Sequence, residues 1–238
     1  LWWMPAAAAE PVTALRLDKA ALEELATEHE AVYRELLRMA AQTLSDRLQQ
    51  ADQLLVRERT VMPTGHYRAE HDLLGERHVP EEAYYGIHTL RAVENFPISG
   101  LPISSLPYLI EALACVKQAA ALANHELNLL EKERADAIVT VCEEIRQGRL
   151  HEQFVVDVIQ GGAGTSTNMN ANEVIANRGL ELMGHRRGEY QYLHPLNHVN
   201  MSQSTNDVYP TALKIALQFE IGQLTAAMQE LYTAFATK

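Results

Sequence analysis

Apolar side chains recur at helical spacing near the start of the chain. One stripe steps by three and four positions through Leu22, Leu25, His29, Val32, Leu36 and Met39. A second, offset stripe runs from Leu37 to Leu55, and charged residues occupy the other faces. Residues 13–60 are therefore predicted to form an amphipathic helix, a helical hairpin or a short coiled coil, an arm that packs or oligomerises without chemistry of its own. Pro63-Thr64-Gly65 is predicted to end this arm.

After the arm, a region rich in glycine and proline is followed by one with helical spacing of apolar residues. Glycine and proline punctuate residues 66–106, so irregular structure is expected there, with only weak strand signals such as Ala83-Tyr84-Tyr85. Helical spacing returns from residue 106, with a first face that includes Leu109 and Leu113.

The second half of the chain continues the helical pattern. Apolar positions within 137–145 form another helical face, and Gly148 is a suitable C-terminal cap for it. The β-branched run 154–159 is predicted to be extended. A long helix is predicted from Asn206 to the end, with Pro210 tolerated in its first turn.

Composition agrees with a helix-rich globular protein. Of the 238 residues, 47% are hydrophobic and 6% aromatic, so a mainly α fold is predicted. The net charge of −11 argues against nucleic acid and acidic membranes as partners. Cys115 and Cys142 lie among apolar neighbours on predicted helices, which favours reduced core thiols over a disulfide or a metal pair.

The sequence is not expected to carry a membrane span or a signal peptide. It has no apolar run long enough to span a membrane, and residues 1–5, Leu-Trp-Trp-Met-Pro, lack the basic region of a signal peptide. A cytoplasmic location is therefore expected. Because the sequence does not begin with methionine, we also expect it to lack its natural start.

Two polar helix starts carry the candidate chemistry. The first is Gly-Gly-Ala-Gly-Thr-Ser-Thr at 161–167, before a helix predicted to reach Met183-Gly184, and the second is Ser-Gln-Ser-Thr-Asn-Asp at 202–207, after a polar loop. Thr165 or Ser166 is expected to cap the first helix, and the hydroxyls of the second segment are expected to cap the last one. Free N–H groups at a helix start favour an anion, so the two starts together would make a donor-rich pocket for a small carboxylate.

Other interpretations of these segments are weaker or stay open. The glycine cluster lacks the Lys-Ser/Thr ending of a nucleotide-hydrolase loop and the spacing of a dinucleotide fingerprint. Asn168, Asn170 and Asn172 are unusual inside a helix and indicate either a ligand or a buried polar network. His194 and His198 are four residues apart, but the intervening proline argues against a metal pair on one helical face.

With their neighbours, these motifs resemble the aspartase/fumarase superfamily. Further matching segments are Asp72-Leu73-Leu74-Gly75, Ala83-Tyr84-Tyr85-Gly86, residues 88–96 (His-Thr-Leu-Arg-Ala-Val-Glu-Asn-Phe) and residues 199–203 (Val-Asn-Met-Ser-Gln), so the resemblance covers roughly residues 68–238. Ser166, Thr205 and Tyr84-Tyr85 favour the aspartases, since class II fumarases usually carry Gln, Ser and Leu-Trp there. Leu196 departs from the Asn that both groups share.

The resemblance implies the reversible removal of ammonia from L-aspartate to give fumarate. A base takes a proton from the carbon beside the β-carboxylate, the charge moves into that carboxylate as an enediolate-like dianion, and the amine leaves. By match to the family motif, Thr165, Ser204 and Thr205 would bind the β-carboxylate, and Asn206 would contact the departing amine. Donors placed around the β-carboxylate would stabilise the charge as it develops.

The same resemblance implies that part of the active site is missing. The family's base is a serine on a mobile Gly-Ser-Ser loop, followed by a lysine that holds the α-carboxylate, and this pattern is absent here. We therefore expect no catalytic base within the chain and no activity from the chain alone. Family active sites are assembled from three subunits of a tetramer, so further copies of the protein are the expected macromolecular partners.

The resemblance also divides the chain. It implies an N-terminal arm at 1–65, a lyase N-terminal domain at 66–205, and the first helix of a central helical bundle at 206–238. No cofactor is implied as required, no metal ligand is assigned, and activation by a divalent cation such as Mg²⁺ stays open. Two alternatives remain: a class II fumarase that interconverts malate and fumarate, and a non-catalytic helical interaction protein.

Overall fold

The computed structural model describes residues 26–27, 30, 33–34, 37–38, 65–160 and 162–236 of a chain that divides into two compact units, Leu1–Leu54 and Leu55–Lys238. The described residues of the first unit are helical, and Arg34 pairs with Glu30 one turn away at 2.6 Å. Most of the predicted amphipathic arm lies outside the described residues.

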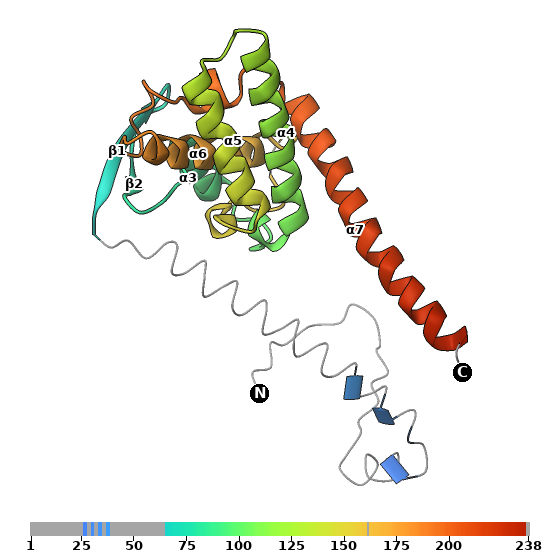
Figure 1. Cartoon of the computed structure of the whole chain (residues 1–238). Coiled ribbons are helices and arrows are strands. Elements are labelled where there is room, and N and C mark those ends of the chain that lie inside the picture. The colour runs from blue at the N-terminus through green and yellow to red at the C-terminus, as the bar shows by residue number, and fades with distance from the viewer. Residues whose placement is uncertain are drawn as a thin grey trace. The chain divides into compact units, whose positions relative to one another are not determined.

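The second unit is built around helix α6. Its elements are, in order, β1 (Tyr67–Asp72), β2 (Gly75–Pro80), α3 (Ile87–Asn95), the 3-10 turn η1 (Ile103–Ser105), α4 (Pro107–Glu126), α5 (Lys132–Arg146), the 3-10 turn η2 (His151–Gln153), α6 (Thr165–Leu182), the π-helical turn η3 (Pro195–Val199) and α7 (Thr205–Ala236). Helices α3, α4, α5 and α7 all contact α6, and α7 extends away from them along most of its length (Figure 1). The prediction of a mainly α fold is confirmed.

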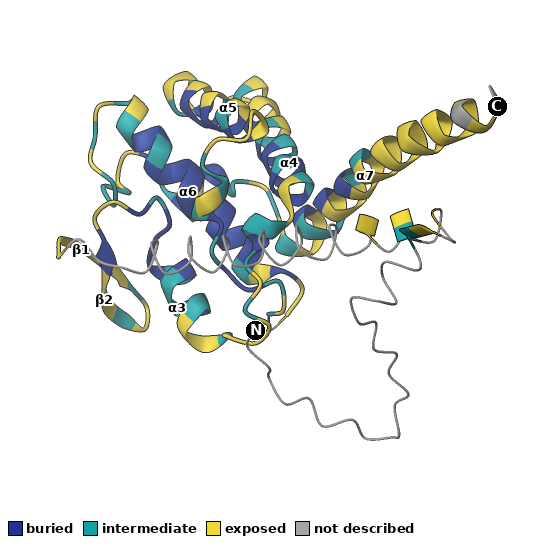
Figure 2. Cartoon of the chain, turned by 90° about the horizontal axis from the view of Figure 1, so that it is seen from below, coloured by how far each residue is buried: buried dark blue, intermediate teal, exposed yellow. Residues whose placement is uncertain are grey.

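Helix α6 is buried although it is polar. Every residue from Thr167 to Asn177 is buried, and the helix is dark blue along most of its length in Figure 2. Buried amides need hydrogen-bond partners, and they find them in the surrounding loops. Asn170 Nδ2 donates to the Gln153 carbonyl at 3.0 Å, and Asn177 Nδ2 donates to the Tyr84 carbonyl at 2.8 Å. The polar side chains of α6 therefore hold the loops that cover it.

The later helices agree with the sequence predictions. Helices α4 and α5 lie where the apolar periodicity placed them, and Gly148 follows the end of α5 with φ +85°. Cys115 and Cys142 are free thiols, the second fully buried. In the described part of the chain, no helix is both long and apolar enough to cross a membrane.

The segment 154–159, predicted to be extended, forms one isolated bridge and bends at residues 156, 158 and 159. Val156 accepts a hydrogen bond from Ile103 N–H at 2.8 Å, and an isolated antiparallel bridge joins Pro102 to Asp157. These backbone contacts attach the run to the segment before α4.

The prediction of irregular structure across 66–106 is wrong. Strands β1 and β2 form an antiparallel hairpin there, with Tyr67 opposite Pro80 and Asp72 opposite Gly75, and α3 follows. Strand β1 lacks the usual alternation of apolar and polar residues because its buried positions hold Arg68 and Glu70.

Arg68 also explains why Ala83-Tyr84-Tyr85 is not a strand, as the sequence had weakly indicated. Its guanidinium donates to the carbonyls of Ala83 and Tyr85 at 2.8 and 2.6 Å, and to that of Pro80 at 2.9 Å. It also pairs with Glu70 at 2.8 Å. These carbonyls accept hydrogen bonds from a side chain instead of from a neighbouring strand. The segment is therefore a loop held in place by one buried arginine.

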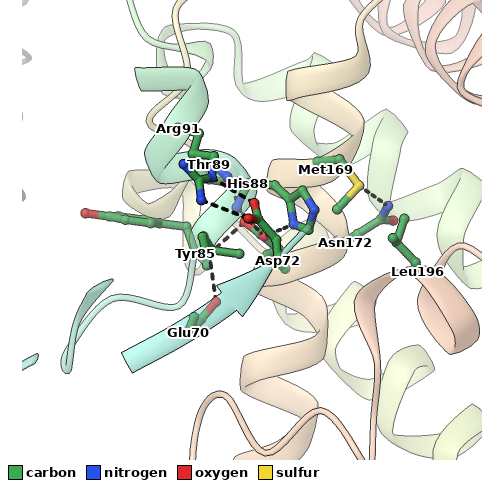
Figure 3. A network of polar contacts seen from close by, with 12 residues as sticks. Glu70, Asp72, Tyr85, His88, Thr89, Arg91, Met169, Asn172 and Leu196 are labelled. Carbon is green, nitrogen blue, oxygen red and sulfur yellow. Dashed lines mark hydrogen bonds and ion pairs between the residues drawn. The ribbon is translucent and has the colours of Figure 1, made fainter. Parts of the chain in front are cut away.

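The start of α3 is held by two buried carboxylates. Glu70 accepts the N–H of Ile87, and Glu173 accepts those of Gly86, His88 and Thr89, all at 2.9–3.0 Å. The N–H groups of a first helical turn have no partner within their helix, and a negative charge there also interacts favourably with the helix dipole. Figure 3 shows β1 facing the start of α3, where Arg91 also forms a bidentate pair with Asp72 at 2.8 Å.

The carboxylate of Glu173 should therefore be essential for this part of the fold. We expect Glu173→Gln to lower the free energy of unfolding by about 3 kcal/mol, because an amide N–H₂ would then face N–H donors in a buried site. Urea unfolding of the 238-residue chain measures this loss. Glu133→Gln, at an exposed position in the first turn of α5, is the control and should stay within about 0.5 kcal/mol of wild type. Equal midpoints for the two variants would contradict the assignment.

Candidate functional site

The starts of α6 and α7 lie against each other. Asn168 Nδ2 on α6 donates to Thr205 Oγ1 on α7 over 2.9 Å. Gly164 permits the approach, since its φ is +85° and a Cβ there would lie 2.2 Å from the Tyr209 ring. The structure thus brings together the two polar helix starts that the sequence singled out. Whether they bind a carboxylate stays a prediction at this point.

Helix α6 is not capped by the residues expected from the sequence. Its N-cap is Gly164, which has no side chain. The Oε1 atom of Gln160 accepts the N–H of Thr167 at 3.0 Å, and its Nε2 donates to the Thr167 hydroxyl. The expectation that Thr165 or Ser166 caps the helix is therefore wrong, because a side chain from before the glycines does so. Thr165 remains exposed to solvent.

Ser204 caps α7, in agreement with the sequence analysis. Its Oγ accepts the N–H of Asn206 at 3.2 Å, and its carbonyl accepts the N–H groups that begin the helix. The helix starts at Thr205, one residue earlier than predicted. Pro210 is consequently its sixth residue and lies beyond the first turn where the sequence analysis placed it. Ser204 and Asn206 are exposed, whereas Thr205 is partly buried.

A network of amides centred on Asn200 lies beside these helix starts. Its Oδ1 accepts from Lys117 Nζ at 2.8 Å, from Asn168 Nδ2 at 3.1 Å and from Asn172 Nδ2 at 3.2 Å. Its Nδ2 donates to the carbonyl of Gln203 at 3.0 Å. The polar network that the asparagines of α6 indicated is therefore present, and it reaches the start of α7 through Asn168.

Lys117 was missed by the sequence analysis. It is fully buried on α4, and this burial lowers the pKa of its ammonium group to about 7. The available signal was its position, since Lys117 shares a helical face with Ile110 and Leu113, where a charged side chain is unexpected.

Both histidines of the polar loop accept hydrogen bonds from backbone N–H groups. His194 Nδ1 accepts the N–H groups of Leu196 and Asn197, and His198 Nδ1 accepts the N–H of His194 at 2.8 Å. Burial lowers the pKa of both rings and so favours the neutral imidazole, in which these backbone donors make Nδ1 the unprotonated nitrogen. This loop contains the π-helical turn η3 that the sequence did not reveal, and the described residues include no group of three or more His, Cys, Asp or Glu side chains placed to hold a metal.

Comparison with known proteins gives a consistent result. A lyase family model matches residues 75–238. The aspartate ammonia-lyases of Pseudomonas fluorescens and Escherichia coli (strain K12) are 60% and 55% identical to the chain over 172 residues, which is 72% of this chain and 36% of each relative. The chain therefore spans about a third of the length of these curated relatives.

Solved structures show the same likeness. A fumarate lyase:delta crystallin structure from Brucella melitensis has a TM-score of 0.71 and 57% identity, covering 73% of this chain and 40% of that one. The recombinant class II fumarase from Schistosoma mansoni has a TM-score of 0.60 and 37% identity, covering 63% of this chain and 32% of that one.

The approach of α6 to α7 should depend on Gly164. We expect Gly164→Ala to lower the free energy of unfolding by about 3 kcal/mol, from backbone strain and from the overlap with Tyr209. Gly184→Ala is a matched control, because Gly184 has φ +80° and no heavy atom within 4 Å of an added Cβ. It should lose only about 1 kcal/mol. Urea unfolding compares the two variants, and equal losses would show that the overlap does not matter.

Burial of Lys117 should make stability depend on pH. With a pKa of about 7 in the folded chain and about 10.4 in the unfolded chain, the unfolded state binds more protons between these values. The free energy of unfolding of wild type relative to Lys117→Met should therefore increase as pH rises from 7 to 9.5. Urea unfolding across this range tests the slope. The exposed Lys132→Met variant should show none, and a difference independent of pH for Lys117→Met would contradict the shift.

Proposed function

The chain belongs to the lyase family of the aspartase/fumarase superfamily, and on this premise we propose that the protein containing it is an aspartate ammonia-lyase. Such an enzyme interconverts L-aspartate with fumarate and ammonia. The observation that carries the proposal is the 55–60% identity to curated aspartate ammonia-lyases over about 172 residues. The class II fumarase from Schistosoma mansoni is only 37% identical, so the identity favours an amine over a hydroxyl as the leaving group.

The start of α7 has the chemistry that the proposed reaction needs. Ser204 Oγ accepts the N–H of Asn206, and Thr205 Oγ1 accepts the Asn168 amide. Each oxygen already receives a hydrogen bond, so each hydroxyl keeps its own hydrogen to donate. We propose that these two hydroxyls and that of Thr165 bind the β-carboxylate and stabilise the negative charge that develops there.

The other half of the reaction needs an amine contact and a base. Asn206 is exposed at the start of α7, and its amide can accept from an ammonium group, so we propose that it contacts the departing amine. We propose that the base lies outside these 238 residues, since the serine loop of the family is absent from them. The 238-residue chain alone should then not convert aspartate.

The exposed part of α7 supports an assembly of several copies. Large apolar side chains are exposed along it: Leu217, Ile221, Leu224, Met228, Leu231, Tyr232 and Phe235. This half of the helix is yellow in Figure 2. We propose that the face packs in the helical bundle of a cytoplasmic homotetramer. We further propose that no cofactor is required and that Mg²⁺ acts at most as an activator.

The complete gene product that contains this sequence should release fumarate from L-aspartate, which is followed by ultraviolet absorbance. We expect Thr205→Val to lower kcat/KM about a hundredfold, because one charge-stabilising donor is lost. The control is Thr140→Val, since Thr140 is an exposed helical threonine whose hydroxyl bonds to its own helix. It should leave kcat/KM unchanged.

Two results would count against the proposal. Faster turnover of malate than of aspartate would identify a fumarase instead. An unchanged kcat/KM in Thr205→Val would remove this hydroxyl from the site while leaving the reaction itself in place.

A further inference from the structure

We propose that Lys117 is a positioning residue for Thr205. Acting through Asn200 and Asn168, the lysine fixes the direction in which the Thr205 hydroxyl donates its hydrogen. The inference rests on the proposed function, because it concerns a hydroxyl assigned there to the β-carboxylate. The connection is a series of hydrogen bonds, and each bond determines which atom donates and which accepts in the next.

The first link is a donation from the lysine. Lys117 Nζ lies 2.8 Å from Asn200 Oδ1 and carries N–H donors both as an ammonium group and as a neutral amine. Asn200 must therefore turn its amide oxygen toward the lysine and its N–H₂ toward the Gln203 carbonyl at 3.0 Å. The reversed amide would place donor against donor at one end and acceptor against acceptor at the other. Lys117 and the Gln203 carbonyl together therefore fix the orientation of Asn200.

The second link passes this orientation to α6. Because Asn200 presents its oxygen, the neighbouring amide of Asn168 must present its N–H₂, which donates to Asn200 at 3.1 Å and to Thr205 at 2.9 Å. A reversed Asn168 would set two amide oxygens against each other. The buried Oδ1 of Asn168 accepts no hydrogen bond from the described residues, so the two donor contacts decide its orientation.

The third link determines the Thr205 hydroxyl. Threonines in helices commonly donate to the carbonyl four residues earlier, as Thr140 and Thr225 do at 2.8 and 2.7 Å. Thr205 is the first residue of α7, so it has no preceding helical turn whose carbonyl could accept its hydrogen. Thr205 Oγ1 is itself occupied by an incoming N–H. Its hydrogen is therefore left for a group outside the network, which in the proposed reaction is the substrate carboxylate.

This role explains why a lysine occupies an apolar environment. Burying an amine is unfavourable, and the lowered pKa of Lys117 reflects that cost. A neutral side chain of similar length, such as methionine, would pack there without it. Methionine offers no N–H to Asn200 Oδ1, whereas lysine offers one in either protonation state.

The test is a double-mutant cycle in the complete gene product. Asn168→Asp keeps the shape of the side chain but turns a donor into an acceptor, so the Thr205 hydroxyl should donate inward. We expect kcat/KM for aspartate to fall about a hundredfold, as in Thr205→Val. In the Thr205→Val background, Asn168→Asp and Lys117→Met should each change kcat/KM by less than about threefold, because the hydroxyl that they orient is already absent.

The matched control is Asn177→Asp on the same helix. Asn177 is also fully buried and also donates to a carbonyl, but it is not part of the series. It should leave kcat/KM within about threefold of wild type in both backgrounds. Losses for Asn168→Asp and Lys117→Met that multiply with that of Thr205→Val would overturn the proposal. So would a loss for Asn168→Asp no larger than that for the control.

Failure of the proposed function gives a different result. A wild-type protein that prefers malate overturns the aspartase assignment, and the same cycle is then measured with malate. If the wild type converts neither substrate, the cycle is measured on urea midpoints of Lys117→Met, Asn168→Asp and their double variant. If the residues form one connected series, the double variant should lose no more stability than the less stable single variant. Additive losses of stability would overturn the connection. Asn168→Asp keeps the test usable if Lys117→Met does not fold.

Discussion

Helix α6 must satisfy its own buried polar groups, and most of the structure around it follows from that constraint. Its amides and its one buried glutamate reach carbonyls and N–H groups in segments that are distant in the sequence. Glu173 holds the start of α3, Asn177 holds the loop before α3, and Asn170 holds the loop before α6. An apolar α6 would bury as much surface but would leave these loops without fixed positions.

The same rule governs the candidate site. Asn168 and Asn172 of α6 meet the buried lysine of α4 through Asn200, and Asn168 continues to the start of α7. Three helices therefore meet through hydrogen bonds rather than through apolar packing alone. Directional bonds specify orientation as well as distance, which is what a site that holds a carboxylate by hydroxyl groups requires.

The sequence predicted the elements whose signals are local. Apolar periodicity located α4 and α5, and the two runs of small polar residues located the starts of α6 and α7. It failed where the stabilising partner is far away in the chain. The hairpin buries Arg68 and Glu70 instead of apolar residues, α3 begins at a glycine held by Glu173, and α6 is capped from before its glycine turn by Gln160. Lys117 was hidden for the same reason, because its partner Asn200 lies 83 positions away.

Helix α7 has one further consequence. Among the described residues of the second unit, the buried contacts of α7 lie in its first turns, at Val208, Ala212 and Ala216, and Phe219 meets Tyr108 edge-on at 6.1 Å between ring centres. An isolated helical segment of this length is marginal in water, so the far half of α7 has little stability of its own. Helix formation in this segment and burial of its apolar face are therefore coupled equilibria. In the proposed assembly, the helical content of the protein would depend on its concentration, because part of the free energy of association would be used to complete the helix.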